Sequence, residues 1–207
     1  MFPLTVFISH FVSDFAFTNV YSPKFFDINN YYKHLIWVVL VFLAFNFDML
    51  KGWGLLIVLF SIVIHILIDI FRINRQRTDL VFQDFSLVVF LFISYLFRSF
   101  FKSSFISEVF QFYIVGMVVS TSFGSYLFRT FNVLERQQKD TVGASERLAI
   151  YIFALANNYL WVVIAIAAGL AYKLIFDKKK NIKELFFSPI YGLISSILWN
   201  YLMVTLF

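Results

Sequence analysis

The stretch "GWGLLIVLFSIVIHILIDIF", residues 52–71, is long and apolar enough to cross a lipid bilayer. A transmembrane helix needs roughly 17 to 25 predominantly apolar residues. Two ionisable residues, His65 and Asp69, interrupt the stretch near its end. Because residues i and i+4 share one face of a helix, these two side chains lie together. We therefore expect a membrane helix that carries a polar pair close to one end.

The composition extends the membrane interpretation to the whole chain. Of its 207 residues, 61% are hydrophobic and only 14% are charged, whereas a soluble domain carries about 25% charged residues. The absence of Cys excludes disulfides, thiolate metal sites and cysteine nucleophiles. The net charge of +5 suits loops that face anionic lipid headgroups, and no basic stripe with interleaved aromatic residues indicates nucleic-acid binding. We expect one integral membrane domain, residues 1–207, with the lipid bilayer as its partner.

The apolar segments predict an all-α, polytopic transmembrane bundle with about six or seven spans. The candidate spans cover approximately residues 2–20, 31–47, 52–71, 80–97, 108–128, 147–176 and 185–207. With these seven spans, nine Lys and Arg residues fall on the side reached after the first span and eight fall on the other side. The positive-inside rule therefore selects no orientation from this count.

A second polar pair stands in "HFVSDF", residues 10–15, within the first candidate span. His10 and Asp14 have the same four-residue spacing as His65 and Asp69, and His34 opens the second span. With seven spans, all of these side chains fall in one leaflet. We expect the five residues to meet in the folded protein.

Three chemical interpretations of this set remain open. Ionisable groups within a bilayer cost at least about 2.5 to 3.5 kcal/mol each, which makes them functional candidates. Imidazole and carboxylate ligands suit Zn, Mn or Fe, and a metal-bound water can attack an ester, an amide or a phosphodiester. The alternatives are a pair of His–Asp hydrogen bonds that tie helices together, and an ion or proton path.

Three further residues are candidate catalytic groups. Asp84 or Glu146 would serve as the general base, and Arg147 would hold an anionic group of the substrate. The competing interpretation of Asp84 is an acid near a helix N-terminus, where the helix dipole favours it. The competing interpretation of Glu146 and Arg147 is that they lie at the solvated start of a helix.

These motifs, in this order, resemble the bacterial integral-membrane family known as domain of unknown function 3307. The resemblance rests on His10-Phe11-Val12-Ser13-Asp14-Phe15, His34, His65, Asp69, Asp84, Gly143, Glu146 and Arg147. The chain departs from the family pattern at Thr18, where a Gln is usual, and at Val88, where a His is usual. The second departure removes one expected metal ligand. The family has no settled activity, so the resemblance implies a fold, a site and a multi-pass location in the bacterial inner (cytoplasmic) membrane.

The leading functional hypothesis is a metal-dependent membrane hydrolase. His10, His34 and His65 would be metal ligands, and Asp14 and Asp69 would be ligands or would orient the ligands. The alternative is a channel, a transporter or a membrane-perturbing effector that uses the same polar cluster as an ion or proton path. A third hypothesis is a scaffold that binds a soluble partner through its basic loops. The partner expected besides lipid is a second copy of the chain, in a homo-oligomer, or this soluble protein.

Overall fold

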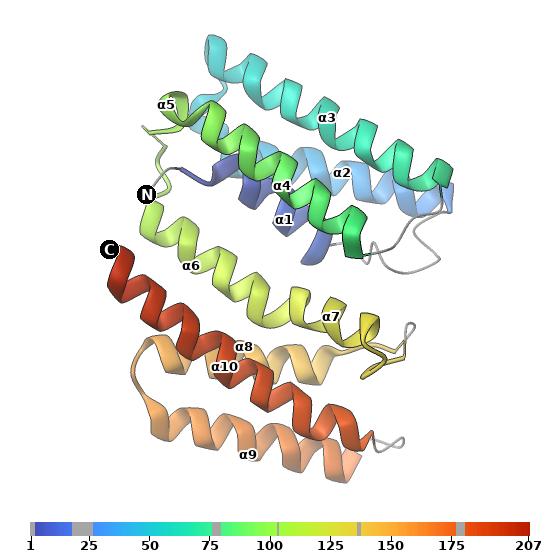
Figure 1. Cartoon of the computed structure of the whole chain (residues 1–207), viewed down its shortest axis with the longest axis vertical. Coiled ribbons are helices and arrows are strands. Elements are labelled where there is room, and N and C mark those ends of the chain that lie inside the picture. The colour runs from blue at the N-terminus through green and yellow to red at the C-terminus, as the bar shows by residue number, and fades with distance from the viewer. Residues whose placement is uncertain (1–2, 18–26, 76–79, 103, 136–137, 177–180) are drawn as a thin grey trace. The chain divides into compact units, whose positions relative to one another are not determined.

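The computed structural model describes residues 3–17, 27–75, 80–102, 104–135, 138–176 and 181–207. Every regular element in these ranges is a helix (Figure 1), which confirms the predicted all-α fold. Among the described residues, five helices are long and apolar enough to cross a membrane. The chain divides into two compact units, Met1–Ile114 and Val115–Phe207, each with its own packed helices. The single integral membrane domain stays a prediction.

The first unit is built around its N-terminal helix, α1 (Thr5–Phe15), which contacts α2, α3 and α4. The unit contains α2 (Ile28–Phe45), η2 (Phe47–Met49), α3 (Trp53–Arg75), α4 (Leu80–Leu96), α5 (Arg98–Phe101) and the start of α6 (Glu108–Val118). Ten of the 11 residues of α1 are buried. This helix is shorter than the expected first span, whose ends fall outside the described residues. Its described part is a core helix that neighbouring helices enclose.

The distribution of polar and apolar side chains around helix α3 is typical of a helix in a membrane bundle. Its buried face carries the polar side chains of Ser61, His65, Asp69 and Arg72, spaced by three or four residues. Its outer face carries exposed large apolar side chains, among them Leu55, Leu56, Leu59, Phe60, Val63 and Leu67. An apolar exterior with polar groups inside is favourable in lipid, where polar residues turn toward the bundle interior.

A continuous helical segment, Glu108–Thr130, matches the expected fifth span. It consists of α6, a π-helical turn η3 (Val119–Phe123) and α7 (Gly124–Thr130). A π turn widens the helix and interrupts the regular pattern of backbone hydrogen bonds. Side chains from other helices bind its carbonyl groups: Tyr191 donates to Val119, and Arg147 donates to Ser120 and Thr121.

The predicted sixth span, residues 147–176, is wrong as a single helix. The chain forms α8 (Thr141–Leu155) and α9 (Tyr159–Phe176), which pack against each other as a hairpin (Figure 1). Asn157 ends α8 with a positive φ of 55°. The amide of Asn158 donates to the carbonyl of Phe153, and the amide of Asn157 donates to that of Ala154. This is the Schellman arrangement that closes a helix, and Asn is one of the few residues that adopts its left-handed position readily.

The hairpin changes where the basic residues of the second unit fall. Helix α10 (Ile182–Leu206) packs on α8, and Asn181 before it donates a hydrogen bond of 2.7 Å to the carbonyl of Val133. The segment after α7 and the segment before α10 therefore meet at one end of this unit. The basic residues that the structure describes in this unit lie on these segments or within the two adjoining helical turns: Arg129, Lys139, Arg147, Lys173 and Lys183. The distribution of nine Lys and Arg residues on one side and eight on the other assumed seven spans, so it does not hold for this fold.

Candidate metal centre

Three helices of the first unit bring six polar side chains together. α1 supplies His10 and Asp14, α2 supplies His34, and α3 supplies His65, Asp69 and Arg72. Each of these residues is at most 1% exposed. The predicted meeting of the five His and Asp residues is confirmed, because their side chains contact one another. Arg72 is an addition that the sequence interpretation had placed in a loop.

The closest group within this cluster is a triangle of ligand atoms. His34 Nε2 lies 3.2 Å from His65 Nε2 and 3.0 Å from Asp69 Oδ2, and His65 Nε2 lies 3.2 Å from Asp69 Oδ2. Ligands at about 2.0 to 2.1 Å from a metal ion are about 2.9 Å apart in an octahedral site and about 3.4 Å apart in a tetrahedral one. The three edges fall in this interval, so the triangle fits one face of a metal coordination shell.

Asp14 lies beside this triangle on the facing helix. Its Oδ1 is 3.3 Å from His65 Nε2 and 3.7 Å from His34 Nε2. A second set of potential ligands, His10, Asp14 and His65, shares His65 with the triangle. This set is looser, since 3.9 Å separate His10 Nδ1 from Asp14 Oδ1. The geometry therefore favours His34, His65 and Asp69 as the ligand set, with Asp14 adjacent.

Arg72 joins the two carboxylates of the cluster. Its Nη2 donates to Asp14 Oδ2 over 3.2 Å, and its Nη1 donates to Asp69 Oδ1 over 3.1 Å. In each carboxylate, the oxygen that faces Arg72 is not the one that faces the histidines. A forked guanidinium can hold two carboxylates in this way, whereas an ammonium is a single point of charge. Arg72 thus fixes the orientation of both Asp14 and Asp69.

A chain of side-chain contacts extends from His65 away from the triangle. His65 Nδ1 lies 3.0 Å from His10 Nδ1, and His10 Nε2 lies 3.2 Å from the Ser86 hydroxyl of α4. If His10 donates from Nε2 to Ser86, its Nδ1 accepts a hydrogen bond from the N–H of His65 Nδ1. The lone pair of His65 Nε2 then points toward His34 and Asp69. Metal-binding histidines commonly donate their other ring N–H to a neighbouring group in this manner.

Aromatic side chains close the cluster on the side of α2 and α4. Phe90 stacks on His10 with ring centroids 4.1 Å apart, and Phe42 presents its ring to His65 at 5.9 Å. Both phenylalanines are fully buried. Low-polarity walls strengthen the electrostatic interactions among the polar groups that they surround.

The structure does not bring Asp84 into the cluster. Asp84 is exposed on α4, whereas Ser86, two residues later, is buried and contacts His10. Residues two positions apart point to nearly opposite sides of a helix. Asp84 therefore lies on the outer face of α4, beyond the first turn of that helix, so the structure does not support its interpretation as an acid at a helix N-terminus.

Glu146 and Arg147 belong to a separate polar cluster in the second unit. Arg147 is fully buried, and its Nη2 lies 2.7 Å from Asp140 Oδ2. Glu146 is 4% exposed, and its Oε2 lies 2.6 Å from Lys173 Nζ of α9. The hydroxyl of Ser188 on α10 donates to Glu146 Oε2 over 2.8 Å. The interpretation of these two residues as a solvated helix start is therefore wrong, and their catalytic roles stay predictions.

Sequence reasoning missed Arg72, Ser86, Asp140 and Lys173. A signal existed for Arg72, because the spacing H-x3-D-x2-R places three side chains on one helix face. Asp140 stands seven residues before Arg147, which is two turns on the same face. Nothing in the sequence indicated that Ser86 or Lys173 would have a specific partner.

Comparison with known proteins identifies no relative of this chain. No protein-family model, no curated protein and no solved structure matches this chain, and the resemblance to domain of unknown function 3307 therefore stays a prediction.

Proposed function

We propose that this chain is a membrane-embedded, metal-dependent hydrolase whose ion is bound by His34, His65 and Asp69. The observation that carries the proposal is the ligand triangle, with edges of 3.0, 3.2 and 3.2 Å. Two imidazoles and one carboxylate are a frequent ligand set of catalytic zinc and of non-haem iron. Three protein ligands leave coordination positions for water or substrate.

The charges of the cluster support a cation as the ligand. Asp14 and Asp69 contribute two negative charges, and Arg72 contributes one positive charge. With neutral histidines the sum is −1, inside a site that excludes water. A divalent ion of Zn, Mn or Fe fits this balance and these donor atoms better than an anion does.

Asp14 is the best-placed general base. Its Oδ1 faces the ligand nitrogens His65 Nε2 and His34 Nε2 at 3.3 and 3.7 Å, on the side away from Arg72. A divalent ion held by His34, His65 and Asp69 would supply the activation of water for hydrolysis. Asp14 Oδ1 would accept a proton beside the ligand atoms, and Arg72 would hold Asp14 and Asp69 in place through their other oxygens. The class of substrate is an ester, an amide or a phosphodiester within or beside the lipid.

A second candidate function is proton transfer, and a specific set of contacts favours it. Ser86, His10, His65 and His34 form a continuous chain with neighbouring atoms 3.2, 3.0 and 3.2 Å apart. One added proton on a histidine would bring the charge of the cluster to zero without a metal ion. Chains of ionisable groups in membranes are typical of proton relays.

Metal content decides between the two candidates. Elemental mass spectrometry on the purified chain should find about one Zn, Mn or Fe per molecule, and His34→Ala and Asp69→Asn should lose it. Ser61→Ala is the matched control, since Ser61 is buried on the same face of α3 and donates to the carbonyl of Ile57 within that helix. A metal-free wild type after metal-supplemented purification would reject the hydrolase. Proton flux in liposomes that His10→Ala abolishes would then support the relay.

Location and assembly are proposed on narrower grounds. The bacterial inner membrane follows from the family resemblance alone. A homo-oligomer or a soluble partner remains a proposal, since the exposed apolar helices are also explained by contact with lipid.

A further inference from the structure

Two connections of the first unit meet at the end where α3 begins. One is residues 46–52, which join α2 to α3, and the other is the segment from α4 to α6 that contains the short helix α5 (Figure 1). The backbone amide of Phe105 donates to Asp48 Oδ2 over 2.8 Å. The rings of Phe47 and Phe105 also contact each other, with centroids 4.4 Å apart. The two connections therefore form one surface at this end.

Large aromatic side chains are exposed on this surface. Phe47, Trp53, Phe100 and Phe105 have exposed fractions of 55%, 74%, 44% and 57%. Contact of so much aromatic area with bulk water is unfavourable, because apolar area gains free energy when water is removed from it. Trp is also enriched at the depth where lipid head groups meet the acyl chains. The aromatic side chains therefore favour a lipid environment for this end of the unit.

Basic side chains and irregular backbone exclude the hydrocarbon core at the same place. Lys51, Arg98 and Lys102 are exposed, and residues 50–52 and 104–107 are not helical. Charged side chains are costly among acyl chains, and irregular backbone that faces acyl chains is not found there. The head-group layer of a bilayer is the environment that accommodates exposed aromatic rings beside ammonium and guanidinium groups.

The sign of the exposed charges selects the kind of lipid. Lys51, Arg98 and Lys102 are exposed, whereas the acidic residues beside them, Asp48 and Glu108, are half-buried. Exposed positive charge near a bilayer attracts lipids whose head groups carry a net negative charge. We propose that this surface lies in the head-group layer and binds the phosphate groups of anionic phospholipids.

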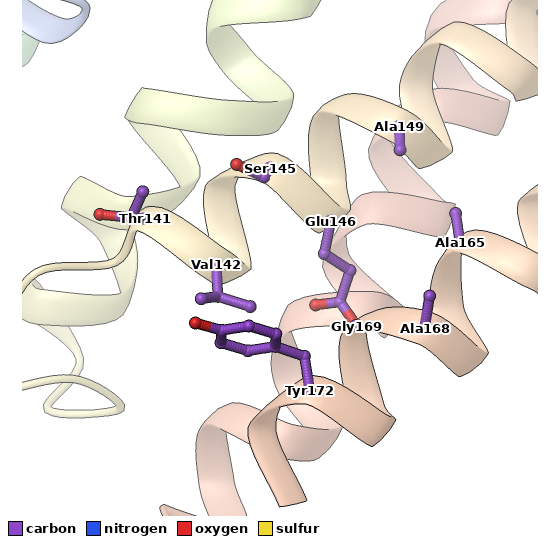
Figure 2. Close-up of a pocket in the computed structure, with 9 residues that line it drawn as sticks. All are labelled: Thr141, Val142, Ser145, Glu146, Ala149, Ala165, Ala168, Gly169 and Tyr172. Carbon is purple, nitrogen blue, oxygen red and sulfur yellow. The ribbon is translucent and has the colours of Figure 1, made fainter. Parts of the chain in front are cut away.

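A hollow between α8 and α9 of the second unit shows the contrast with a purely apolar surface (Figure 2). It has a volume of about 370 Å³, and Ala149, Ala165, Ala168 and Gly169 form much of its wall. Its surface is almost wholly apolar, so acyl chains alone are sufficient to cover it. The surface around α5 combines aromatic and basic groups, and it therefore requires head groups as well.

The lipid surface is separate from the metal centre of the same unit. Trp53 is the first residue of α3, and His65 lies about 18 Å further along that helix. Substitutions at the surface therefore leave the metal ligands in place, and a failure of lipid binding is distinguishable from a failure of metal binding.

Hydrogen–deuterium exchange of the full chain in lipid nanodiscs measures head-group contact at this surface. Discs of phosphatidylcholine alone are compared with discs that also contain phosphatidylglycerol of the same acyl chains. We expect peptides that contain residues 50–52 or 104–107 to exchange more slowly with the anionic lipid, by about fivefold, the gain in affinity that one basic residue near an anionic surface provides. Equal exchange in the two kinds of disc would overturn the proposal.

Two matched double substitutions locate the binding. Lys51→Gln with Lys102→Gln removes two exposed charges from this surface and should abolish the slower exchange in anionic discs. Lys33→Gln with Arg75→Gln removes two exposed charges at the start of α2 and the end of α3, and should retain it. Slower exchange that persists in the first variant would reject this surface. Slow exchange that is equal in both lipids and disappears when each disc holds a single chain would assign the surface to a second copy and also overturn the proposal.

Discussion

Arg72 and Asp14 are 58 positions apart in the chain, yet Nη2 of Arg72 donates to Oδ2 of Asp14 over 3.2 Å. The same guanidinium donates to Asp69 on its own helix. Helices α1 and α3 are thereby tied through one buried cation. The integrity of the cluster depends on a residue that is neither His nor Asp.

Arg72→Met should destabilise the chain strongly. It would leave two buried carboxylates without their shared cation, and removal of one partner from a buried ion pair costs about 3 to 5 kcal/mol. Arg72→Lys should recover only part of this loss, because an ammonium cannot match the fork that spans both carboxylates. Thermal unfolding in detergent measures the effect. Arg75→Met, on the exposed last turn of α3, is the control and should change stability little.

Binding of Zn²⁺ should raise the unfolding temperature of the metal-depleted protein. A ligand at 100 times its dissociation constant stabilises the native state by about 2.7 kcal/mol. Asp69→Asn keeps the size of the side chain and removes the ligand charge, so the stabilisation should disappear. An unchanged response to Zn²⁺ in Asp69→Asn would remove Asp69 from the ligand set.

The Glu146–Lys173 pair should behave as one unit. Glu146→Gln alone leaves a buried ammonium, and Lys173→Met alone leaves a buried carboxylate, each at a cost of about 3 to 5 kcal/mol. The double substitution removes both members of the 2.6 Å pair and leaves only the more distant Glu184, 4.0 Å from Lys173 Nζ in the native chain, so it should be less destabilising than the sum of the single changes. A double-mutant cycle by thermal unfolding measures this coupling. Additive effects would contradict the pairing.

Gly169→Ala should also destabilise the second unit. The added Cβ would meet Glu146 Oε1 at 2.5 Å and the carboxyl carbon at 2.8 Å. Lys173 and Ser188 hold the opposite oxygen, so the carboxylate cannot move away without losing them. Ala168→Gly, at the exposed neighbouring position, should cost no more than the helix propensity difference of about 1 kcal/mol. The same unfolding assay compares the two.

Membrane orientation can be tested with single cysteines, since the chain has none of its own. If the chain lies in a cell membrane, the positive-inside rule predicts that the basic end of the second unit faces the cytoplasm. Lys139→Cys and Lys183→Cys should both be protected from an impermeant thiol reagent in intact cells, and Ala156→Cys in the hairpin turn should react. A single helix over residues 147–176 would instead place Lys139 and Lys183 on opposite sides of the membrane.

The sequence predicted the His and Asp cluster of the first unit more accurately than it predicted the membrane spans. The four-residue spacing of His10 with Asp14, and of His65 with Asp69, was sufficient to place each pair on one face. The predicted span over residues 147–176 failed because Asn157, in a left-handed conformation, reverses the chain within it, and the polar pair Asn157–Asn158 was not interpreted as a break. Contact partners on other helices, such as Ser86 for His10, depend on helix rotation and depth, which local spacing does not specify.

The π turn at Val119–Phe123 has a consequence for the periodicity of the fifth span. A π turn accommodates about one extra residue, which advances the helical phase by roughly 100°. Ser120 within the π turn and Ser125 and Arg129 after it are all buried. Deletion of Ser122 would restore uniform α-helical phase and rotate Ser125 away from the guanidinium of Arg147, which it now contacts at 2.7 Å. The π turn in the polar stretch "STSFGS", residues 120–125, therefore lets the two halves of this helical segment direct their polar side chains toward the same core.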